Sequence, residues 1–261
     1  MTILCRHIIF RFFFITGILF AGACCGQTNK IDQLSRNAAL AANNNDKLSA
    51  LLVLCEEHEN MNRDSLYQTA QQCRRLAQAQ TDPRKKALAA SALINAWLRL
   101  GKTDSAKALI EAELPYVSVK DPALRDAYFK LALQKVDCFG DASKYEDALT
   151  ELFSIISFAE TYRDTAVLMK SMNTIGVINY NLDHVPDAYK WYFKGLALAN
   201  GNPATRAMES AICINLAETY RWEEKTDSAF YYLNRAIPFC EKNEHLFYLA
   251  NALRVKASIY K

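Results

Sequence analysis

An internal repeat constrains the fold of this chain more than any other feature. Ala106, Ala148, Ala188 and Ala229 follow one another at nearly equal intervals, and Leu66 stands one further interval before Ala106. Four positions after the alanines stand Ile110, Leu152, Tyr192 and Leu233. The period, about 40 residues, is typical of solenoids, which stack one repeated supersecondary unit.

Small residues at fixed positions predict that each repeat is a pair of antiparallel helices. Two helices approach closely only where both present small side chains, so we expect Gly176 to face Ala188, and Ala217 to face Ala229 and Ala236. The turns agree with this interpretation. Asp104-Ser105 and Asp227-Ser228 offer N-cap residues, and Pro186 suits a first turn, where each second helix should begin.

Composition supports an all-α fold. Eight glycines and six prolines among 261 residues are less than half the usual share, which excludes collagenous, linker-like and turn-rich all-β chains. A hydrophobic content of 51% with 23% charged residues is enough to bury a core. We therefore expect helical hairpins at residues 47–80, 84–117, 122–160, 164–200 and 204–241, and a final helix from about residue 244 to residue 261.

The repeats resemble the tetratricopeptide repeat (TPR). The match is carried by Asn215-Leu216-Ala217, Tyr220, Ala229, Leu233 and Ala236, and nearly as well by Ile175-Gly176, Ala188, Tyr192 and Gly195. The units around Leu66 and Ala148 match weakly. The period, roughly 40 to 42 against the usual 34, is similar to that of the long-helix variety in bacterial regulators and kinesin light chains. Over residues 47–261 the resemblance implies an all-α, right-handed α-α superhelix of about five hairpins plus a final helix.

The same resemblance implies a protein or peptide partner bound on a concave wall formed by the first helix of each hairpin. Asn215 is the best match, because TPR domains use Asn there to hold a peptide backbone or carboxylate, although the Lys and Arg of a full carboxylate clamp are missing from this unit. For each single position a solvated helix face remains the alternative. The groove positions are Asn95, Arg99, Lys170, Asn173, Val177, Tyr180, Asn181, Asn215, Glu218, Arg221, Trp222 and Arg254.

The first 27 residues have the layout of an export signal. Arg6 and Arg11 precede an uncharged apolar run over residues 12–23, which is shorter than the roughly 20 residues of a membrane-spanning helix. Residues 1–23 are thus expected to be a signal peptide or membrane anchor, and residues 24–46 a linker or short helix. Ala21-Gly22-Ala23 before Cys24 resembles a bacterial lipobox and also suits ordinary signal peptidase. Lipidation of Cys24, plain secretion and an uncleaved anchor stay open, and each places the chain in the periplasm or cell envelope.

Several function classes are disfavoured. Without Arg6 and Arg11, 29 basic residues face 28 acidic ones, which leaves no excess of positive charge for nucleic acid. No P-loop or GxGxxG motif can be written, and the four histidines are too far apart for a metal site. We expect no enzymatic activity, no cofactor and no metal.

Five cysteines lie in the repeat region, namely Cys55, Cys73, Cys138, Cys213 and Cys240. An odd number argues against a complete disulfide framework, and free cysteines in helices behave as small buried hydrophobes. One bridge, Cys55 to Cys73 or Cys213 to Cys240, remains open because each pair would lie on adjacent antiparallel helices.

Two functional hypotheses follow. The first is an exported, membrane-tethered TPR scaffold that binds a protein or peptide in its concave groove. The second is the extracytoplasmic sensor region of a larger signalling receptor or transcriptional regulator. Ala257 and Tyr260 repeat the pair Ala217 and Tyr220 just before the sequence stops at Lys261, in the middle of a hairpin, which favours the second hypothesis. A final helix that shields the last hairpin as a cap is the alternative and stays open.

Overall fold

The computed structural model describes residues 25–57, 61–243 and 245–260, and these residues form helices joined by turns, with no strand among them. Cys24, the expected lipidation site, and the export segment lie outside the described residues. The helices are α1 (Cys25–Ala39), α2 (Asn44–Glu56), α3 (Arg63–Gln78), α4 (Pro83–Arg99), α5 (Thr103–Glu113), the 3₁₀ helix η2 (Leu114–Tyr116), α6 (Arg125–Asp141), α7 (Tyr145–Tyr162), α8 (Thr165–Asn181), α9 (Val185–Ala197), α10 (Pro203–Trp222), α11 (Thr226–Lys242) and α12 (Leu246–Ile259).

The helices form a solenoid of hairpins, as the repeat predicted. Each α-helix packs against the next one along the chain, which gives the pairs α2–α3, α4–α5, α6–α7, α8–α9 and α10–α11, followed by α12. The stretch expected to be a linker or short helix contains the 15-residue α1, which packs against α2. The fold is therefore an all-α superhelical solenoid, and the predicted fold class is confirmed.

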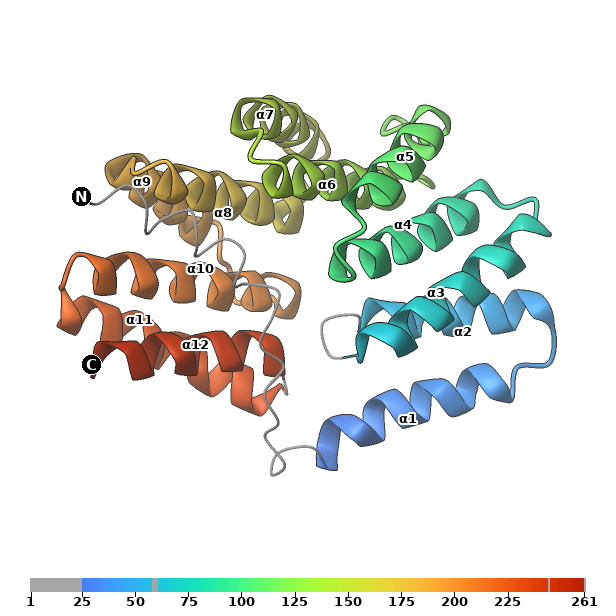
Figure 1. Ribbon diagram of the computed structural model, residues 1–261, viewed down its shortest axis with the longest axis horizontal. Helices are drawn as coiled ribbons and strands as arrows, with labels where there is room; N and C mark the ends of the chain where they lie inside the picture. Colours follow the sequence, from blue (N-terminus) through green and yellow to red (C-terminus); the bar gives the residue numbers. More distant parts are fainter. Residues whose placement is uncertain (1–24, 58–60, 244, 261) are drawn as a thin grey trace.

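The solenoid bends into an arch with an inner and an outer layer of helices. Helices α1 to α3 lie at one end, α6 and α7 at the top, and α10 to α12 at the other end (Figure 1). Each of α2, α4, α6, α8, α10 and α12 packs against the next member of this series, so these six helices form the inner layer. An ion pair joins Lys130 of α6 directly to Glu56 of α2, past α4, and such a link between second neighbours fits only the inside of a curve.

The repeat anchors form the contact points between helices. Leu66 and the four anchor alanines are fully buried, and so are Ile110, Leu152, Tyr192 and Leu233 four positions after the alanines. The alternation of small and large residues seen in the sequence therefore records packing. In the α8–α9 hairpin, for example, Gly176 leaves room for the ring of Tyr192.

Two details of the hairpins go beyond the repeat pattern. Tyr192 is the residue packed most closely against Gly176, because atoms of its ring are the nearest to the place that a Cβ atom at residue 176 would take. Helices α5 and α11 begin earlier than expected, with Lys102 and Lys225 at the N-cap and no side-chain capping hydrogen bond. Asp104 and Asp227 lie instead in the first turn, where a negative charge stabilises the positive end of the helix dipole. Helix α9 begins as expected, with Pro186 in its first turn.

Candidate binding surface on the inner helices

All twelve predicted groove positions lie on inner helices, and the structure divides them into two groups. The group at the α4 end is engaged in holding the solenoid together, whereas the group on α8, α10 and α12 forms a polar surface. On α4 lie Asn95 and Arg99, on α8 Lys170, Asn173, Val177, Tyr180 and Asn181, on α10 Asn215, Glu218, Arg221 and Trp222, and on α12 Arg254.

Amide side chains join neighbouring inner helices. Nε2 of Gln134 on α6 donates to Oδ1 of Asn95 at 2.7 Å and to the backbone oxygen of Ser91 at 2.9 Å. Nδ2 of Asn215 donates to Oδ1 of Asn173 at 2.8 Å, which joins α10 to α8. Three of the predicted ligand-binding amides therefore already have partners within the protein, and their first role is to set the spacing of the inner helices.

Gln134 is a member of this set that the sequence prediction missed. Its position carries a signal, because Asn95 and Gln134 are 39 residues apart and Asn173 and Asn215 are 42 residues apart, which is close to the repeat period. We call Asn95, Gln134, Asn173 and Asn215 the amide ladder. Gln134 is buried, and its Oε1 has no hydrogen-bond partner among the described residues.

The α4 end of the inner wall is closed by side-chain links. Nη1 of Arg99 donates to the backbone oxygen of Met61 at 2.9 Å, which ties α4 to the segment just before α3. Nζ of Lys85 reaches Asn45 at 2.6 Å, and the ion pair of Lys130 with Glu56 passes over α4. Arg99 and Asn95 are therefore structural links in this structure.

Three inner helices meet at a charged cluster. Nε and Nη2 of Arg221 donate to the two carboxylate oxygens of Glu218, each at 3.0 Å, and Nη1 of Arg254 on α12 lies 3.8 Å from Oε1 of Glu218. Hydrogen bonding to Glu218 raises the pKa of Arg221 above its ordinary value, and the nearby hydroxyl of Tyr180 on α8 adds to the shift. The structure thus brings together four of the predicted residues, with two cations around one carboxylate.

The wall is loosest between α6 and α8, which touch over a shorter stretch than the other neighbouring inner helices. Lys170 of α8 and Asp137 of α6 face each other there, both exposed to solvent. Neighbouring helices displace part of the water around Asp137, and this desolvation raises the pKa of its carboxyl above the ordinary value while the charge of Lys170 opposes the shift.

The remaining predicted residues flank this cluster. Asn181 near the end of α8 holds a buried Nδ2 that finds no hydrogen-bond acceptor within the described part of the chain. Trp222 at the end of α10 is 39% exposed, with the Arg221 guanidinium 5.7 Å from the centre of its ring. The polar surface on α8, α10 and α12 that we call the inner patch is formed by exposed and partly exposed residues, namely Lys170, Tyr180, Asn181, Glu218, Arg221, Trp222 and Arg254.

Aromatic residues on the outer helices have a different role. Tyr192 is fully buried, whereas its neighbour Phe193 is 40% exposed. Aromatic rings of successive outer helices contact one another. The ring centres of Phe153 on α7 and Trp191 on α9 are 5.8 Å apart, and those of Phe193 on α9 and Tyr232 on α11 are 6.4 Å apart. These contacts explain the aromatic content of the second helices through packing.

Within the described ranges, no group of three or more histidine, cysteine or acidic side chains is placed to hold a metal ion. In the same ranges no helix has the length and apolar character needed to cross a membrane.

Comparison with known proteins supports the fold alone. No protein-family model matches the chain, and no curated protein sequence matches it. Among solved structures the chain is similar to the crystal structure of BtubC (BKLC) from P. vanneervenii, with a TM-score of 0.60 and 17% sequence identity over 90% of this chain and 92% of that chain. The likeness covers nearly the whole length of both proteins, and at this identity it shows a shared all-helical architecture.

Proposed function

We propose that this protein is a TPR scaffold that binds a peptide segment of another protein on its inner patch. The observation that carries the proposal is the gathering of Tyr180, Glu218, Arg221 and Arg254 from three different inner helices. A surface made by several rigid helices holds its side chains in place before binding, which lowers the entropic cost of binding a flexible peptide.

The chemistry of the patch indicates how a peptide would be held. Arg and Trp side chains are enriched at the energetic centres of protein interfaces. Asn181 offers an unused buried donor, and Lys170 adds an exposed cation at the rim. We expect the peptide to supply backbone carbonyls and at least one carboxylate, because donors and cations predominate in the patch.

The test is a selection of random dodecamer peptides displayed on phage against the full-length protein, followed by fluorescence anisotropy of the enriched peptides. The double variant Lys170→Ala, Arg254→Ala should weaken binding at least about tenfold, which corresponds to the loss of about 1.4 kcal/mol. Lys190→Ala, at an exposed lysine on the outer helix α9, is the matched control and should bind as the parent does. Enriched peptides that bind the double variant and the parent equally would refute the inner patch as the site.

We further propose that the protein is exported and held at the membrane through Cys24. The support is the sequence of residues 1–27, with its basic start, apolar run and small residues before the cysteine. Mass spectrometry of the native amino terminus from a membrane fraction tests this. A diacyl or triacyl Cys24 supports the proposal, and an unmodified residue at the amino terminus refutes the lipid anchor.

One structural observation favours the alternative, that the chain is the sensor region of a larger receptor. Leu253 and Tyr260 on the α12 side are 46% and 73% exposed, and with Ala257 they form an apolar stripe. The equivalent residues of α10 are Cys213, Ala217 and Tyr220, which are covered by α11. The full mass of the native protein, read in the same experiment, distinguishes the two hypotheses.

A further inference from the structure

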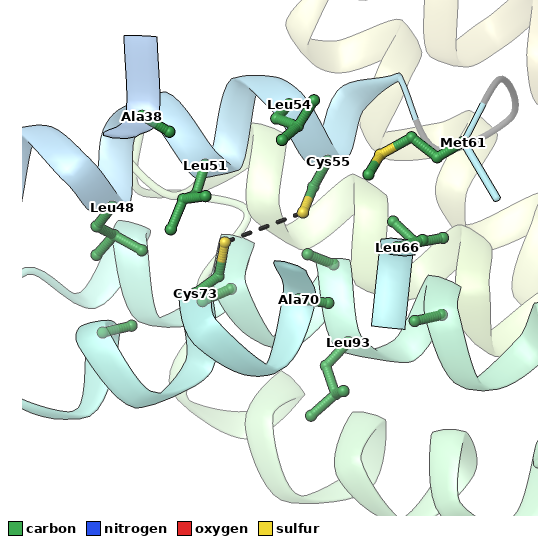
Figure 2. Packing of buried hydrophobic residues seen from close by; sticks show 14 residues of the cluster. Ala38, Leu48, Leu51, Leu54, Cys55, Met61, Leu66, Ala70, Cys73 and Leu93 are labelled. Atoms are coloured by element: carbon green, nitrogen blue, oxygen red, sulfur yellow. Dashed lines mark hydrogen bonds between the residues drawn. The ribbon is translucent and has the colours of Figure 1, made fainter. Parts of the chain in front are cut away.

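Two cysteines from adjacent helices meet inside the core at the α1 end of the solenoid. Cys55 lies in the last turn of α2 and Cys73 in the middle of α3, and their sulfur atoms are 3.9 Å apart (Figure 2). Figure 2 shows the two side chains pointing toward each other between the helices. The sequence left open whether a disulfide joins Cys55 to Cys73 or Cys213 to Cys240. The structure shows a contact between the sulfur atoms of Cys55 and Cys73.

The environment of the pair is dry and apolar. Cys73 is fully buried and Cys55 is 5% exposed, and Leu51, Leu54 and Ala70 belong to the same cluster of buried side chains. The hydrogen bond with Cys73 and burial both raise the pKa of Cys55 well above its ordinary value. The Cys55 thiol therefore stays protonated in the folded protein and exchanges slowly, because the thiolate is the reactive form.

The other described cysteines differ from this pair. Cys240 is buried with the hydroxyl of Ser210 as a hydrogen-bond partner, although it lies near enough to Cys213 to affect the pKa of that thiol. Cys138 on α6 has acidic neighbours, Asp137 and Asp141, rather than a second thiol. Among the five thiols that the structure describes, Cys55 and Cys73 are thus the pair placed for a covalent link.

We propose that Cys55 and Cys73 form a disulfide that joins α2 to α3 while the chain folds in the presence of a disulfide oxidant, such as oxidised glutathione or the disulfide of a thiol oxidoreductase. The two thiols are oxidised and lose two protons and two electrons, and the oxidant disulfide takes them up and is reduced to two thiols. Side-chain rotation must bring the sulfur atoms from 3.9 Å to the bond length of about 2.05 Å.

The link would stabilise the end of the solenoid where cooperative support is weakest. The α2–α3 hairpin has a single helix, α1, on its outer side, whereas an internal hairpin has a whole hairpin on each side, and solenoid stability depends on such neighbour interfaces. The disulfide encloses residues 56–72 in a closed loop, which lowers the entropy of the unfolded chain and so favours the folded state. This inference is independent of the proposed binding function, because neither cysteine belongs to the inner patch.

The experiment is to refold the full-length protein in a buffer with oxidised and reduced glutathione, alkylate the remaining thiols in acid and map the peptides by mass spectrometry. We expect a linked Cys55–Cys73 peptide as the main disulfide species. We also expect the thermal midpoint Tm of the linked protein to exceed that of the dithiothreitol-reduced protein by about 5 °C or more, the order that closing a loop of this size produces.

The controls compare oxidised with reduced protein for each variant, so a general loss of stability does not affect the result. Cys55→Ala and Cys73→Ala should abolish the difference in Tm, whereas Cys213→Ala and Cys240→Ala should retain it. The proposal is overturned if Cys55 and Cys73 are both alkylated after oxidative refolding. It is equally overturned if linked protein melts at or below the Tm of reduced protein.

Discussion

At the scale of single residues, packing between the two helices of a hairpin depends on where a side chain is missing. Gly176 of α8 leaves the space that the ring of Tyr192 on α9 occupies, and a Cβ atom at residue 176 would lie 2.5 Å from Cδ1 of that ring. Tyr192 is among the largest fully buried side chains, so neighbouring atoms surround its ring and limit any shift away from residue 176. The glycine is required here for close approach.

Gly176→Ala should therefore lower the free energy of unfolding by about 1–3 kcal/mol, the usual cost of overpacking a core. Gly140→Ala is the matched control, since Gly140 also lies in an inner helix but a Cβ atom there would have no neighbouring atom within 4 Å. It should be neutral or stabilising by up to about 1 kcal/mol, because alanine favours helix. Urea denaturation of both variants checks the prediction, and equal effects would contradict it.

At the scale of helices, the amide ladder pairs its members two by two. Asn95 bonds with Gln134, and Asn173 bonds with Asn215, so α4 is joined to α6 and α8 to α10. The step from Gln134 to Asn173 coincides with the looser contact between α6 and α8. Polar contacts within a largely apolar interface fix the register of two helices, because an unpaired buried amide is costly.

A double-mutant cycle tests the pairing. Asn173→Ala and Asn215→Ala should show a coupling energy of about 0.5–1.5 kcal/mol in thermal or urea unfolding, as expected for a hydrogen bond between partly buried amides. Asn95→Ala with Asn215→Ala combines residues from different pairs and should be additive. Coupling energies that do not differ between the two cycles would show that the ladder does not pair as described.

At the scale of the whole molecule, each helix of the solenoid depends on its near neighbours in the chain. The anchor Ala229 of α11 is fully buried in a cluster drawn from α10, α11 and α12, far along the chain from the cluster around Cys55 and Cys73. Because contacts are confined to near neighbours, damage at one end of a solenoid is transmitted weakly to the other.

Ala229→Leu should cost about 1–3 kcal/mol by overpacking the hairpin of α10 and α11. Hydrogen exchange should show faster exchange of backbone amides in α10, α11 and α12, while the amides of α2 and α3 keep the protection of the parent protein. A variant that melts as the parent does would refute the repeat register. A uniform loss of protection over all helices would instead refute independence of the two ends.

Much of the fold could be predicted because burial leaves a periodic record in the sequence. Leu66 and the four anchor alanines were identified from spacing alone, and all five are fully buried. The helix starts were less accurate, since Asp104 and Asp227 favour both an N-cap and a first turn, and the choice depends on how the preceding turn packs. The inner location of the predicted binding residues was expected from the resemblance to the tetratricopeptide repeat, in which the first helix of each hairpin forms the concave wall.

The sequence by itself determined the all-α class, the hairpin unit and the side of each helix that is buried, because these depend on local periodicity. Only the tertiary structure decided which side chains meet. It paired Asn215 with Asn173, turned Arg99 toward the backbone of Met61 and brought Cys55 into contact with Cys73. Such contacts depend on the register and spacing of neighbouring helices to within a few ångströms. Register and spacing are set by the packing of many side chains at once, and the sequence of a single repeat does not contain that information.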